Sequence, residues 1–386
     1  MRKGWEYKKL GEIGKIVTGS TPSTKDESNY TPREYCFVKP SDLPSQGIGD
    51  IEETEYYVSK VGLSKSRVLP AGSVLVSCIG SIGKIGILTK EACSNQQINA
   101  IISQGVIDSR FIAYSLYAQR FVLESIANAP VVPIINKTDF SKIRIGIPPK
   151  STQLAIVSEL DKINELIRLK KEQLKDFDNL AQSLFYEMFG DPVENEKGWE
   201  VKKLKEIATE KLSYGSGASA VPFNTSVRYI RITDINEYGE LKEEKVSPNI
   251  FEEKYLLAEG DILFARSGAT VGKTYLHKRN ENPCIYAGYL IRLRPNEKLV
   301  LPNYVYYYTK SNYYKSFICA NQRVVAQPNI NAKQYGDLEL PLPPLSLQHL
   351  FAQRIEQIER EKSEVQKSIH SKPCWLPACN TGSNRS

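Results

Sequence analysis

The segment Gly268-Ala269-Thr270-Val271-Gly272-Lys273-Thr274 carries the residue types of a phosphate-binding loop, in which backbone N–H groups and a lysine hold phosphate oxygens. Its spacing is one residue short of the GxxxxGK[ST] pattern. A phosphate-binding loop must open a helix, whereas Tyr275-Leu276-His277 predicts a strand. A shorter copy, Gly80-Ser81-Ile82-Gly83-Lys84, also precedes a predicted strand. Both segments favour a glycine-rich hairpin whose lysine faces a nucleic-acid phosphate, and a nucleotide-binding enzyme that uses Gly268–Thr274 is the alternative.

Apart from this loop, the sequence offers few groups arranged for catalysis or metal binding. The three histidines, His277, His349 and His370, are not spaced as metal ligands with the cysteines. Cys374 and Cys379 stand near the end of the chain without further ligands. The sequence contains neither a GxSxG nor an HExxH signature, nor the Asn/Asp-Pro-Pro-aromatic motif of amino-methyltransferases. We therefore predict no catalytic residue, no metal and no cofactor in this chain.

A further set of side chains suits hydrogen bonding with the base edges or phosphates of DNA. In the first half of the chain these predicted DNA-binding residues are Thr18, Ser20, Lys39, Ser41, Asp42, Ser77, Ser81, Lys84, Asn95, Gln96 and Gln97. In the second half they are Arg228, Arg231, Thr233, Asp234, Arg266, Ser267, Lys273, Tyr286, Tyr289, Asn321, Gln322 and Arg323. Each residue alone also fits an ordinary polar surface, a turn or, for the tyrosines, a core. As a set near the two glycine-rich segments they favour DNA binding.

The net charge of +7 is unevenly distributed. Residues 1–150 contain 19 Lys and Arg against 14 Asp and Glu, and residues 197–345 contain 21 against 16, so each segment carries +5. The connection, residues 151–196, contains 5 against 10 and carries −5. Two basic lobes joined by an acidic spacer suit a DNA contact in two places, because phosphates need neutralising only where a lobe touches. Chance imbalance on a large surface is the alternative.

Five blocks of sequence occur twice in the same order, which is the mark of an internal repeat. Gly4-Trp5-Glu6-Tyr7-Lys8-Lys9-Leu10 returns as Gly198-Trp199-Glu200-Val201-Lys202-Lys203-Leu204. The other blocks pair Ala71–Val76 with Glu259–Phe264, Gly80–Lys84 with Gly268–Lys273, Pro133–Asn136 with Pro328–Asn331, and Ile147–Pro149 with Leu342–Pro344. The residues between the blocks differ. A duplicated frame with divergent contents predicts two similar domains.

Each copy predicts a mixed α/β domain, so the fold class is α+β. Val74–Val76 and Ile262–Phe264 are short apolar runs behind glycine turns, which is typical of buried strands. Phe111–Ile126 and its counterpart Tyr304–Ile318 have apolar residues at helical spacing. No apolar run approaches the ~20 residues that span a bilayer. The seven scattered cysteines and the lack of a secretory signal favour a cytoplasmic protein.

A heptad pattern follows each copy. The apolar positions of the first segment are Ile156, Leu160, Ile163, Ile167, Leu174, Phe177 and Leu184, and those of the second are Phe351, Ile355, Ile358, Val365 and Ile369. Steps of four and three place these side chains on one helix face, which predicts a coiled-coil seam with Lys170 as a polar position. Ser151 and Ser346 stand where N-caps are expected. We predict two helices that pair antiparallel.

This combination resembles the specificity subunit of type I restriction–modification enzymes. The resemblance rests on the Gly-Trp-Glu-x-Lys-Lys-Leu openings, the Gly-x-x-Gly-Lys hairpin with its one-residue-longer second copy, Phe37–Leu43 with its partner Tyr229–Ile235, and the Pro-Pro-x-x-x-Gln helix starts at Gln153 and Gln348. It covers residues 1–371. It implies a pseudo-twofold repeat, with target recognition domains at 1–150 and 191–345, a central spacer helix at 151–190 and a distal helix at 346–371.

The resemblance also implies a non-catalytic, sequence-specific DNA-binding subunit. Each domain would recognise one half of an interrupted double-stranded DNA site, and the helices would set the spacing and dock two methyltransferase subunits. Those partners bind S-adenosylmethionine and methylate adenine, and motor-nuclease subunits that use ATP and Mg join for restriction. No membrane partner is expected. A coiled-coil adaptor that binds only other proteins is the alternative.

The end of the chain departs from the family pattern, in which the second helix is usually about as long as the first. The heptads stop near Ile369, and Pro373-Cys374-Trp375-Leu376-Pro377 cannot continue them. We predict an irregular tail at 372–386 and a weaker pairing of the two helices.

Overall fold

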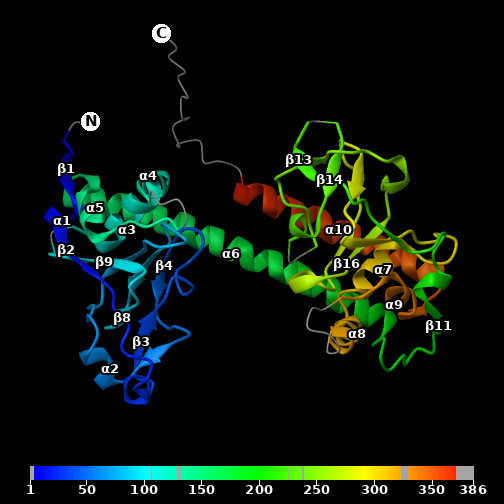
Figure 1. Cartoon of the computed structure of the whole chain (residues 1–386), viewed down its shortest axis with the longest axis horizontal. Helices are drawn as coiled ribbons and strands as arrows, with labels where there is room; N and C mark the ends of the chain where they lie inside the picture. Colours follow the sequence, from blue (N-terminus) through cyan, green and yellow to red (C-terminus); the bar gives the residue numbers. More distant parts are fainter. Residues whose placement is uncertain are drawn as a thin grey trace, which may run out of the picture. The chain divides into compact units, whose positions relative to one another are not determined.

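The computed structural model describes residues 4–105, 107–127, 132–224, 226–236, 239–322 and 329–370 (Figure 1). Contacts between residues divide the chain into two compact units, Met1–Leu169 and Lys170–Ser386, which we call the first and second unit. The long helix α6 (Lys150–Phe189) contributes one stretch to each unit.

The first unit is built around a five-stranded sheet of order β2-β9-β6-β7-β4. A three-stranded sheet β5-β3-β8 and the pair β1-β10 complete it. The elements are β1 (Glu6–Lys9), α1 (Leu10–Ile13), β2 (Gly14–Thr18), η1 (Glu27–Asn29), β3 (Tyr35–Val38), β4 (Ile48–Ile51), β5 (Tyr57–Val58), α2 (Lys60–Ser64), β6 (Val74–Ser77), β7 (Ile85–Leu88), β8 (Cys93–Ser94), β9 (Ile98–Ser103), α3 (Ser109–Ala118), α4 (Arg120–Ile126), α5 (Lys137–Lys142) and β10 (Arg144–Ile147).

The second unit repeats this plan around a four-stranded sheet of order β12-β19-β16-β17. The pairs β14-β18, β13-β15 and β11-β20 surround it. The elements after α6 are β11 (Glu200–Lys203), η2 (Leu204–Glu206), β12 (Ser213–Tyr214), β13 (Ala220–Pro222), β14 (Arg228–Ile230), η3 (Ile232–Asp234), β15 (Val246–Pro248), η4 (Glu253–Tyr255), β16 (Ile262–Ala265), η5 (Gly268–Thr270), β17 (Thr274–Leu276), β18 (Cys284–Tyr286), β19 (Leu290–Leu293), α7 (Pro302–Tyr308), α8 (Asn312–Gln322), α9 (Ala332–Gly336), β20 (Glu339–Leu342) and α10 (Leu345–His370).

The predicted strands β6 and β16 are confirmed, and each lies at the centre of its unit. Side chains of a strand alternate between the two faces of the sheet. Val74 and Val76 therefore join one core cluster while Leu75 joins another. In β16, Ile262 and Phe264 likewise belong to one core cluster and Leu263 belongs to another. Burial on both faces explains why these strands are continuous apolar runs rather than alternating ones.

The frame of the two units is the same down to single hydrogen bonds. Leu10 N donates to Ile143 O (2.9 Å) beside the β1-β10 pair, and Leu204 N donates to Leu338 O (2.9 Å) beside the β11-β20 pair. The parallel pair β3-β8 has its counterpart in the parallel pair β14-β18. The internal repeat inferred from the sequence is thus a repeat of structure.

Two predicted helices are wrong in their continuity. The segment Phe111–Ile126 is divided into α3 and α4 at Gln119, and Tyr304–Ile318 is divided into α7 and α8. At the break between α7 and α8, polar side chains bond to the backbone and end the helical turns. The Thr309 hydroxyl bonds back to Tyr306 O (2.6 Å), and the Ser311 hydroxyl accepts from Tyr314 N (3.3 Å).

The two long helices are present, but neither begins directly after its predicted N-cap residue. Both α6 and α10 begin before the predicted cap, so Ser151 and Ser346 lie inside the first turn. The start is instead fixed by a buried glutamine. Gln153 Nε2 donates to Pro148 O (3.0 Å), while its Oε1 accepts from Asp108 N (3.1 Å). Gln348 does the same with Pro343 O (2.7 Å) and Leu301 N (2.8 Å).

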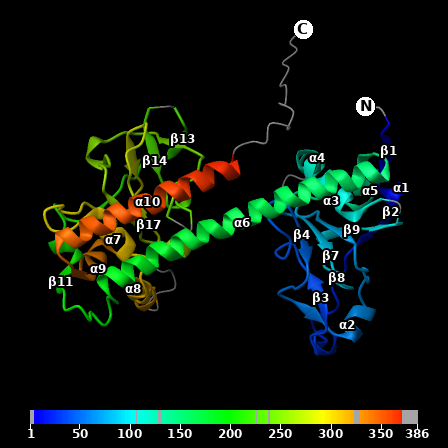
Figure 2. The same cartoon turned by 180° about the vertical axis from the view of Figure 1, so that it is seen from behind.

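In the second unit α6 and α10 pair antiparallel, as predicted, and Figure 2 shows them side by side. As the residue numbers rise along α6, the numbers of the contacting residues on α10 fall. Lys170 Nζ donates to Ser368 Oγ (2.7 Å) and Lys362 Nζ to Asp178 Oδ1 (2.8 Å). The rings of Phe185 and Phe351 lie 5.9 Å apart.

Residues of the predicted seam pack against the cores of the two units as well as between the two helices. Ile156 and Leu160 pack against the core of the first unit, where neighbouring Val157 is buried. Leu184 and Ile358 pack against the core of the second unit, in which Phe351 and Ile355 are buried. The remaining seam residues, Ile163, Ile167, Leu174, Phe177, Val365 and Ile369, are half-buried.

Candidate nucleic-acid interface

In the first unit several loops meet beyond the C-terminal ends of the parallel strands β3 and β8. These loops, which we call the first loop surface, are residues 19–22, 39–42, 78–84, 94–97 and 132–136. Backbone hydrogen bonds join them: Ser20 N to Ser94 O (2.8 Å), Asn95 N to Val38 O (3.1 Å), Cys78 N to Gln97 O (2.7 Å) and Gly80 N to Pro133 O (3.1 Å). Residues far apart in the sequence are thereby brought to one face of the unit.

The second unit has the same arrangement. Its loops, the second loop surface, are residues 215–218, 231–234, 266–273, 287–289 and 329–331. The matching hydrogen bonds are Ser216 N to Tyr286 O (2.8 Å), Ala287 N to Ile230 O (2.9 Å) and Arg266 N to Tyr289 O (3.1 Å). The polar and glycine-rich segments singled out in the sequence therefore converge separately in each unit.

Gly19 and Gly215 occupy matching positions where two of these loops touch. A Cβ atom at Gly19 would overlap the carbonyl oxygens of Ser94 and Asn95. One at Gly215 would overlap those of Tyr286 and Ala287. Only glycine permits this approach, so both loop surfaces depend on it.

A carboxylate closes a loop in each surface. Asp42 accepts from Lys39 N (2.7 Å) and Glu55 N (3.1 Å). Asp234 is buried and accepts from Arg231 N (2.9 Å) and from the guanidinium of Arg231. That hydrogen-bonded carboxylate raises the pKa of Arg231, which stays charged. Both aspartates shape the backbone of their own chain rather than face outward.

The first loop surface exposes part of its predicted DNA-binding set. Ser41, Ser81 and Gln96 are exposed, and Thr18, Ser20, Lys39, Lys84 and Gln97 are partly so. Ser77 and Asn95 are buried. The Ser77 hydroxyl accepts from Lys84 N (2.9 Å), and Asn95 Nδ2 donates to Gln97 Oε1 (2.8 Å). The buried pair fixes loop geometry and is left out of the interface that we propose.

The second loop surface exposes Thr233 and Tyr289, with Arg231, Arg266, Ser267, Lys273 and Asn321 partly exposed. Arg228 is buried, and its Nη2 donates to Lys242 O (2.6 Å). Asn321 Oδ1 accepts from Gln334 Nε2 (3.0 Å). Arg323 and the side chain of Gln322 lie outside the described residues.

The phosphate-binding-loop alternative is wrong. Gly268–Thr270 forms a short 3₁₀ turn, and the chain then enters β17, which pairs antiparallel with β16. No helix opens after this loop, so backbone N–H groups do not converge as a phosphate cradle requires. The predicted hairpins are present, whereas the contact of their lysines with phosphate stays a prediction, and Lys84 Nζ donates to Pro40 O (3.2 Å) within its own unit.

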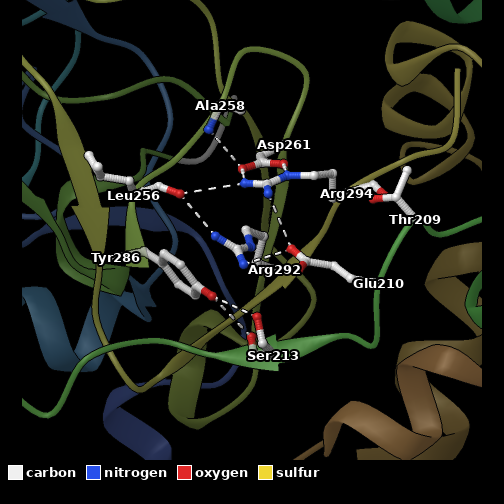
Figure 3. A network of polar contacts seen from close by, with 9 residues as sticks. All are labelled: Thr209, Glu210, Ser213, Leu256, Ala258, Asp261, Tyr286, Arg292 and Arg294. Carbon is white, nitrogen blue, oxygen red and sulfur yellow. Dashed lines mark hydrogen bonds and ion pairs between the residues drawn. The ribbon is translucent and has the colours of Figure 1, made fainter. Parts of the chain in front are cut away.

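Tyr286 belongs to a polar network beneath the second loop surface (Figure 3). Its ring is buried, and its hydroxyl lies 2.8 Å from Ser213 Oγ. Arg292 Nη2 contacts Glu210 Oε1 (2.7 Å), and Arg294 Nε contacts the buried Asp261 (2.8 Å). Burial raises the pKa of Tyr286, so its phenol stays neutral. The residue joins β18 to β12, and its buried hydroxyl points into its own unit.

Tyr214 and Arg67 contribute to the loop surfaces and were missed in the sequence. The Arg266 guanidinium lies 4.7 Å from the ring centroid of Tyr214, whose side chain is exposed. Arg67 Nη1 donates to Thr18 O (2.6 Å). Tyr214 directly precedes Gly215 as Thr18 precedes Gly19, so aligning these two glycines would have found it.

The described residues contain no group of three or more His, Cys, Asp or Glu side chains placed to hold a metal ion. Burial raises the pKa of the Cys78 thiol to about 12 and that of Cys93 to about 11. Both therefore remain protonated packing groups at neutral pH. Within the described ranges, none of the helices is both long and apolar enough to cross a bilayer.

Comparison with known proteins identifies the repeated unit. The family described as "Type I restriction modification DNA specificity domain" matches residues 2–176 and again residues 196–372. The chain belongs to this family. It is therefore a type I specificity-subunit chain with two recognition domains in tandem, and the two loop surfaces occupy corresponding places in those domains.

Curated relatives agree with this assignment. The MjaIX specificity subunit of Methanocaldococcus jannaschii is 25% identical over 294 residues, which cover 70% of this chain and 67% of the relative. The MjaVIII specificity subunit of the same organism is 22% identical over 94% of this chain and 90% of the relative. The EcoKI specificity subunit of Escherichia coli is 20% identical over 96% of this chain and 85% of the relative.

Solved structures share the fold. A chain from work on complex assembly and conformational transition of the type I R-M system gives a TM-score of 0.52 at 17% identity, over 96% of this chain and 93% of that chain. The S subunit of a type I restriction–modification system from M. genitalium gives 0.51 at 17% identity, over 95% and 94%.

Proposed function

We propose that each domain recognises one half of a bipartite double-stranded DNA site through its loop surface, and that the chain itself catalyses nothing. In this proposal α6 and α10 set the spacing of the half-sites and dock two methyltransferase subunits. The chemistry then belongs to those partners, with S-adenosylmethionine, and to motor-nuclease subunits with ATP and Mg. As a DNA-binding subunit the chain would act in the cytoplasm.

One observation carries the proposal: the two units repeat the same loop framework while the side chains on it differ. The bonds Cys78 N to Gln97 O and Arg266 N to Tyr289 O are backbone bonds, so they tolerate any side chain. A fixed frame with variable contents is what two independent readers of different sequences require. A single catalytic site would instead need one fixed set of side chains.

The exposed side chains suit the two kinds of DNA contact. Gln96 and Gln97 carry amides, which pair with the N6 and N7 edge of adenine, and Arg266 has the fork that pairs with guanine O6 and N7. Ser41, Ser81 and Thr233 have hydroxyls that suit phosphate oxygens. We expect each neutralised phosphate to contribute about −0.9 to the slope of log affinity against log salt.

Exchange of one domain tests the proposal. Residues 197–345 are replaced by the matching segment of a relative, and the chain is co-expressed with its methyltransferase partner. Sequencing of methylated adenines should show one half of the recognised site changed and the other half unchanged.

The reciprocal exchange of residues 1–150 is the matched control and should change only the other half-site. If either exchange altered both halves together, the domains would not be independent readers. Methylation without sequence preference in the parent complex would also contradict the proposal.

A further inference from the structure

Arg266 is the first residue of the 266–273 loop of the second loop surface and directly follows β16. Its backbone is fixed by two other loops of that surface. Arg266 N donates to Tyr289 O (3.1 Å), and Arg266 O accepts from Ile330 N (2.9 Å). The side chain is partly exposed. A firmly held backbone therefore carries a guanidinium that reaches the surface of the unit.

Two side chains hold the guanidinium of Arg266. Its Cζ lies 4.7 Å from the ring centroid of Tyr214, a distance at which a cation is attracted to the face of an aromatic ring. Its Nε donates to Asn329 Oδ1 (3.3 Å). Tyr214 is itself anchored, because its hydroxyl oxygen accepts from Ala332 N (3.0 Å). Together the ring and the amide restrict the positions that the guanidinium can take.

The terminal nitrogens of Arg266, Nη1 and Nη2, are not used in these contacts. Among the residues that the structure describes, neither nitrogen has a hydrogen-bond acceptor and no carboxylate forms an ion pair with the guanidinium. Arginine has five N–H donors in a planar fork, and only the donor on Nε is occupied here. The other four donors are available to a group from outside the unit.

A purely structural role explains these contacts poorly. Tyr214 and Asn329 are exposed and Arg266 is partly exposed, so the three side chains do not build a core. An exposed cation–π contact adds little to stability, and ordering a long arginine side chain costs conformational entropy. The same arrangement favours binding, because a side chain that is already ordered loses less entropy when a ligand arrives.

We propose that Arg266 recognises a guanine in the half-site of the second unit, and that Tyr214 and Asn329 are positioning residues that hold its fork for this base. The inference rests on the proposed function, since it names a base that this loop surface would recognise. Guanine presents O6 and N7 side by side on its major-groove edge, and the two terminal nitrogens of an arginine match that pair of acceptors.

A DNA phosphate is the other acceptor that an arginine fork can take. A phosphate contact needs a positive charge in the right place, which the flexible side chain of a lysine also supplies. The first loop surface has such a cation, since Lys39 Nζ lies 3.0 Å from the ring centroid of Tyr56. A planar fork restricted by two neighbours gains most from two acceptors in fixed positions within one plane. Guanine has that geometry and is therefore favoured over phosphate.

Base analogues test the proposal on the unmodified chain. Methylome sequencing, with exchange of residues 197–345, gives the half-site that the second unit recognises. Each guanine of this half-site is then replaced in a synthetic duplex by 7-deazaguanine, which lacks N7 and still pairs with cytosine. Competition binding to the complex of the full chain with its methyltransferase partner should be weakened about ten- to a hundredfold at one guanine. A half-site without guanine, or one in which no replacement weakens binding, would overturn the proposal.

Variants of the chain then assign the effect to residues. Arg266→Lys keeps the charge but lacks the fork, so the effect of 7-deazaguanine should fall to about twofold or less. Tyr214→Leu and Asn329→Ala keep Arg266 but loosen it, and each should reduce the effect to about three- to fivefold, with the 7-deazaguanine duplex bound within about twofold of the parent. Tyr214→Phe keeps the ring and should restore nearly the full effect. Tyr56→Leu, the matched control, removes a tyrosine that contacts a lysine and should change nothing at this guanine.

The contrary outcomes are distinct. If Arg266→Lys retained the full effect of 7-deazaguanine, another residue would recognise the guanine and the proposal would be wrong. If Arg266→Ala weakened all duplexes alike and lowered the salt slope by about 1, Arg266 would contact a phosphate, which also overturns it. An unchanged effect in both Tyr214→Leu and Asn329→Ala would overturn the positioning role. None of these outcomes bears on the independence of the two half-sites, which domain exchange tests separately.

Discussion

The two loop surfaces have the same backbone hydrogen bonds but carry different side chains. Where the first surface has the buried thiol of Cys78, the second has the partly exposed guanidinium of Arg266, and both residues donate through backbone N. The residues that precede Gly19 and Gly215 also differ: Thr18 is partly exposed, and Tyr214 is exposed. Residues that build the frame use main-chain atoms or the carboxylates of Asp42 and Asp234, whereas the side chains that differ between the units include exposed ones such as Ser81 and Tyr289.

This difference suggests how one framework can serve two recognition tasks. The exposed groups of the first surface are hydroxyls and amides, such as Ser81 and Gln96. The second surface carries an arginine stacked on a tyrosine, with Tyr289 nearby. We expect the first half-site to depend on amide contacts with adenine and the second on an arginine contact with guanine.

Substitution of the shared glycines, Gly19 and Gly215, should have the largest effect on the loop surfaces. Gly215→Val places a branched side chain against the carbonyl oxygens of Tyr286 and Ala287, which cannot move apart without breaking β18 from its neighbours. We expect destabilisation of the second unit by about 3 kcal/mol or more. Methylome sequencing should show loss of the half-site that this unit recognises.

Gly268→Ala is the matched control, because a Cβ atom there meets open space and only its positive φ of 69° opposes the change. Its cost should be about 1 kcal/mol. If Gly215→Val folded and recognised DNA normally, the close approach of the two loops would not be needed for the surface.

The next largest effect should come from a side chain present in only one surface. Arg266→Ala removes the guanidinium and its stack on Tyr214, and should weaken DNA binding by about 1–3 kcal/mol while relaxing one position of the half-site. Competition assays with single-base variants of the site measure both changes. Cys78→Ala alters the corresponding residue of the first unit and should leave specificity unchanged, since that side chain is buried. Equal relaxation in both variants would contradict the assignment.

The sequence predicted the repeated frame well because its determinants are local. Buried strands such as β6 and β16 appear as apolar runs, and the heptads of α6 and α10 follow from one helix face. The caps were missed because the helix starts depend on Gln153 and Gln348, whose partners, Asp108 and Leu301, are 45 and 47 residues away. The repeated Pro-Pro-x-x-x-Gln pattern shows where each glutamine stands, but it does not show which distant backbone group the glutamine bonds.

The candidate site was predicted as a neighbourhood but not residue by residue. Ser77, Asn95 and Tyr286 belong to the right loops and strands, yet each is buried with partners in its own unit. A polar residue that fixes a loop and one that faces DNA have the same residue type. Only the distribution of exposure across the folded unit separates them.

The helices allow the comparison to be extended to spacing. Four residues inserted between Leu169 and Lys170 lengthen α6 by about 6 Å. The contacts of Lys170 with Ser368 and of Asp178 with Lys362 all lie after the insertion, so the helix pair of the second unit should persist. At about 3.4 Å per base pair, the two half-sites should lie one or two base pairs further apart in the methylome. Unchanged half-sites are expected, and an unchanged spacer in an active complex would show that α6 does not measure DNA.

The smallest effect should distinguish the two aspartates that close the loops. Asp234→Asn removes the charged partner of the Arg231 guanidinium from a buried position, whereas Asp42→Asn leaves an oxygen that still accepts from one of two backbone N–H groups. We expect the first change to cost about 2 kcal/mol and the second about 1 kcal/mol. Hydrogen exchange of the full chain, followed by mass spectrometry of peptides, measures the loss locally. Amides around Arg231–Asp234 should exchange about 30-fold faster in the first variant, and those around Lys39–Asp42 about fivefold faster in the second. The two changes would be equal if both carboxylates acted only through the backbone, and the ion pair of Arg231 with Asp234 would then add nothing to the stability of its loop.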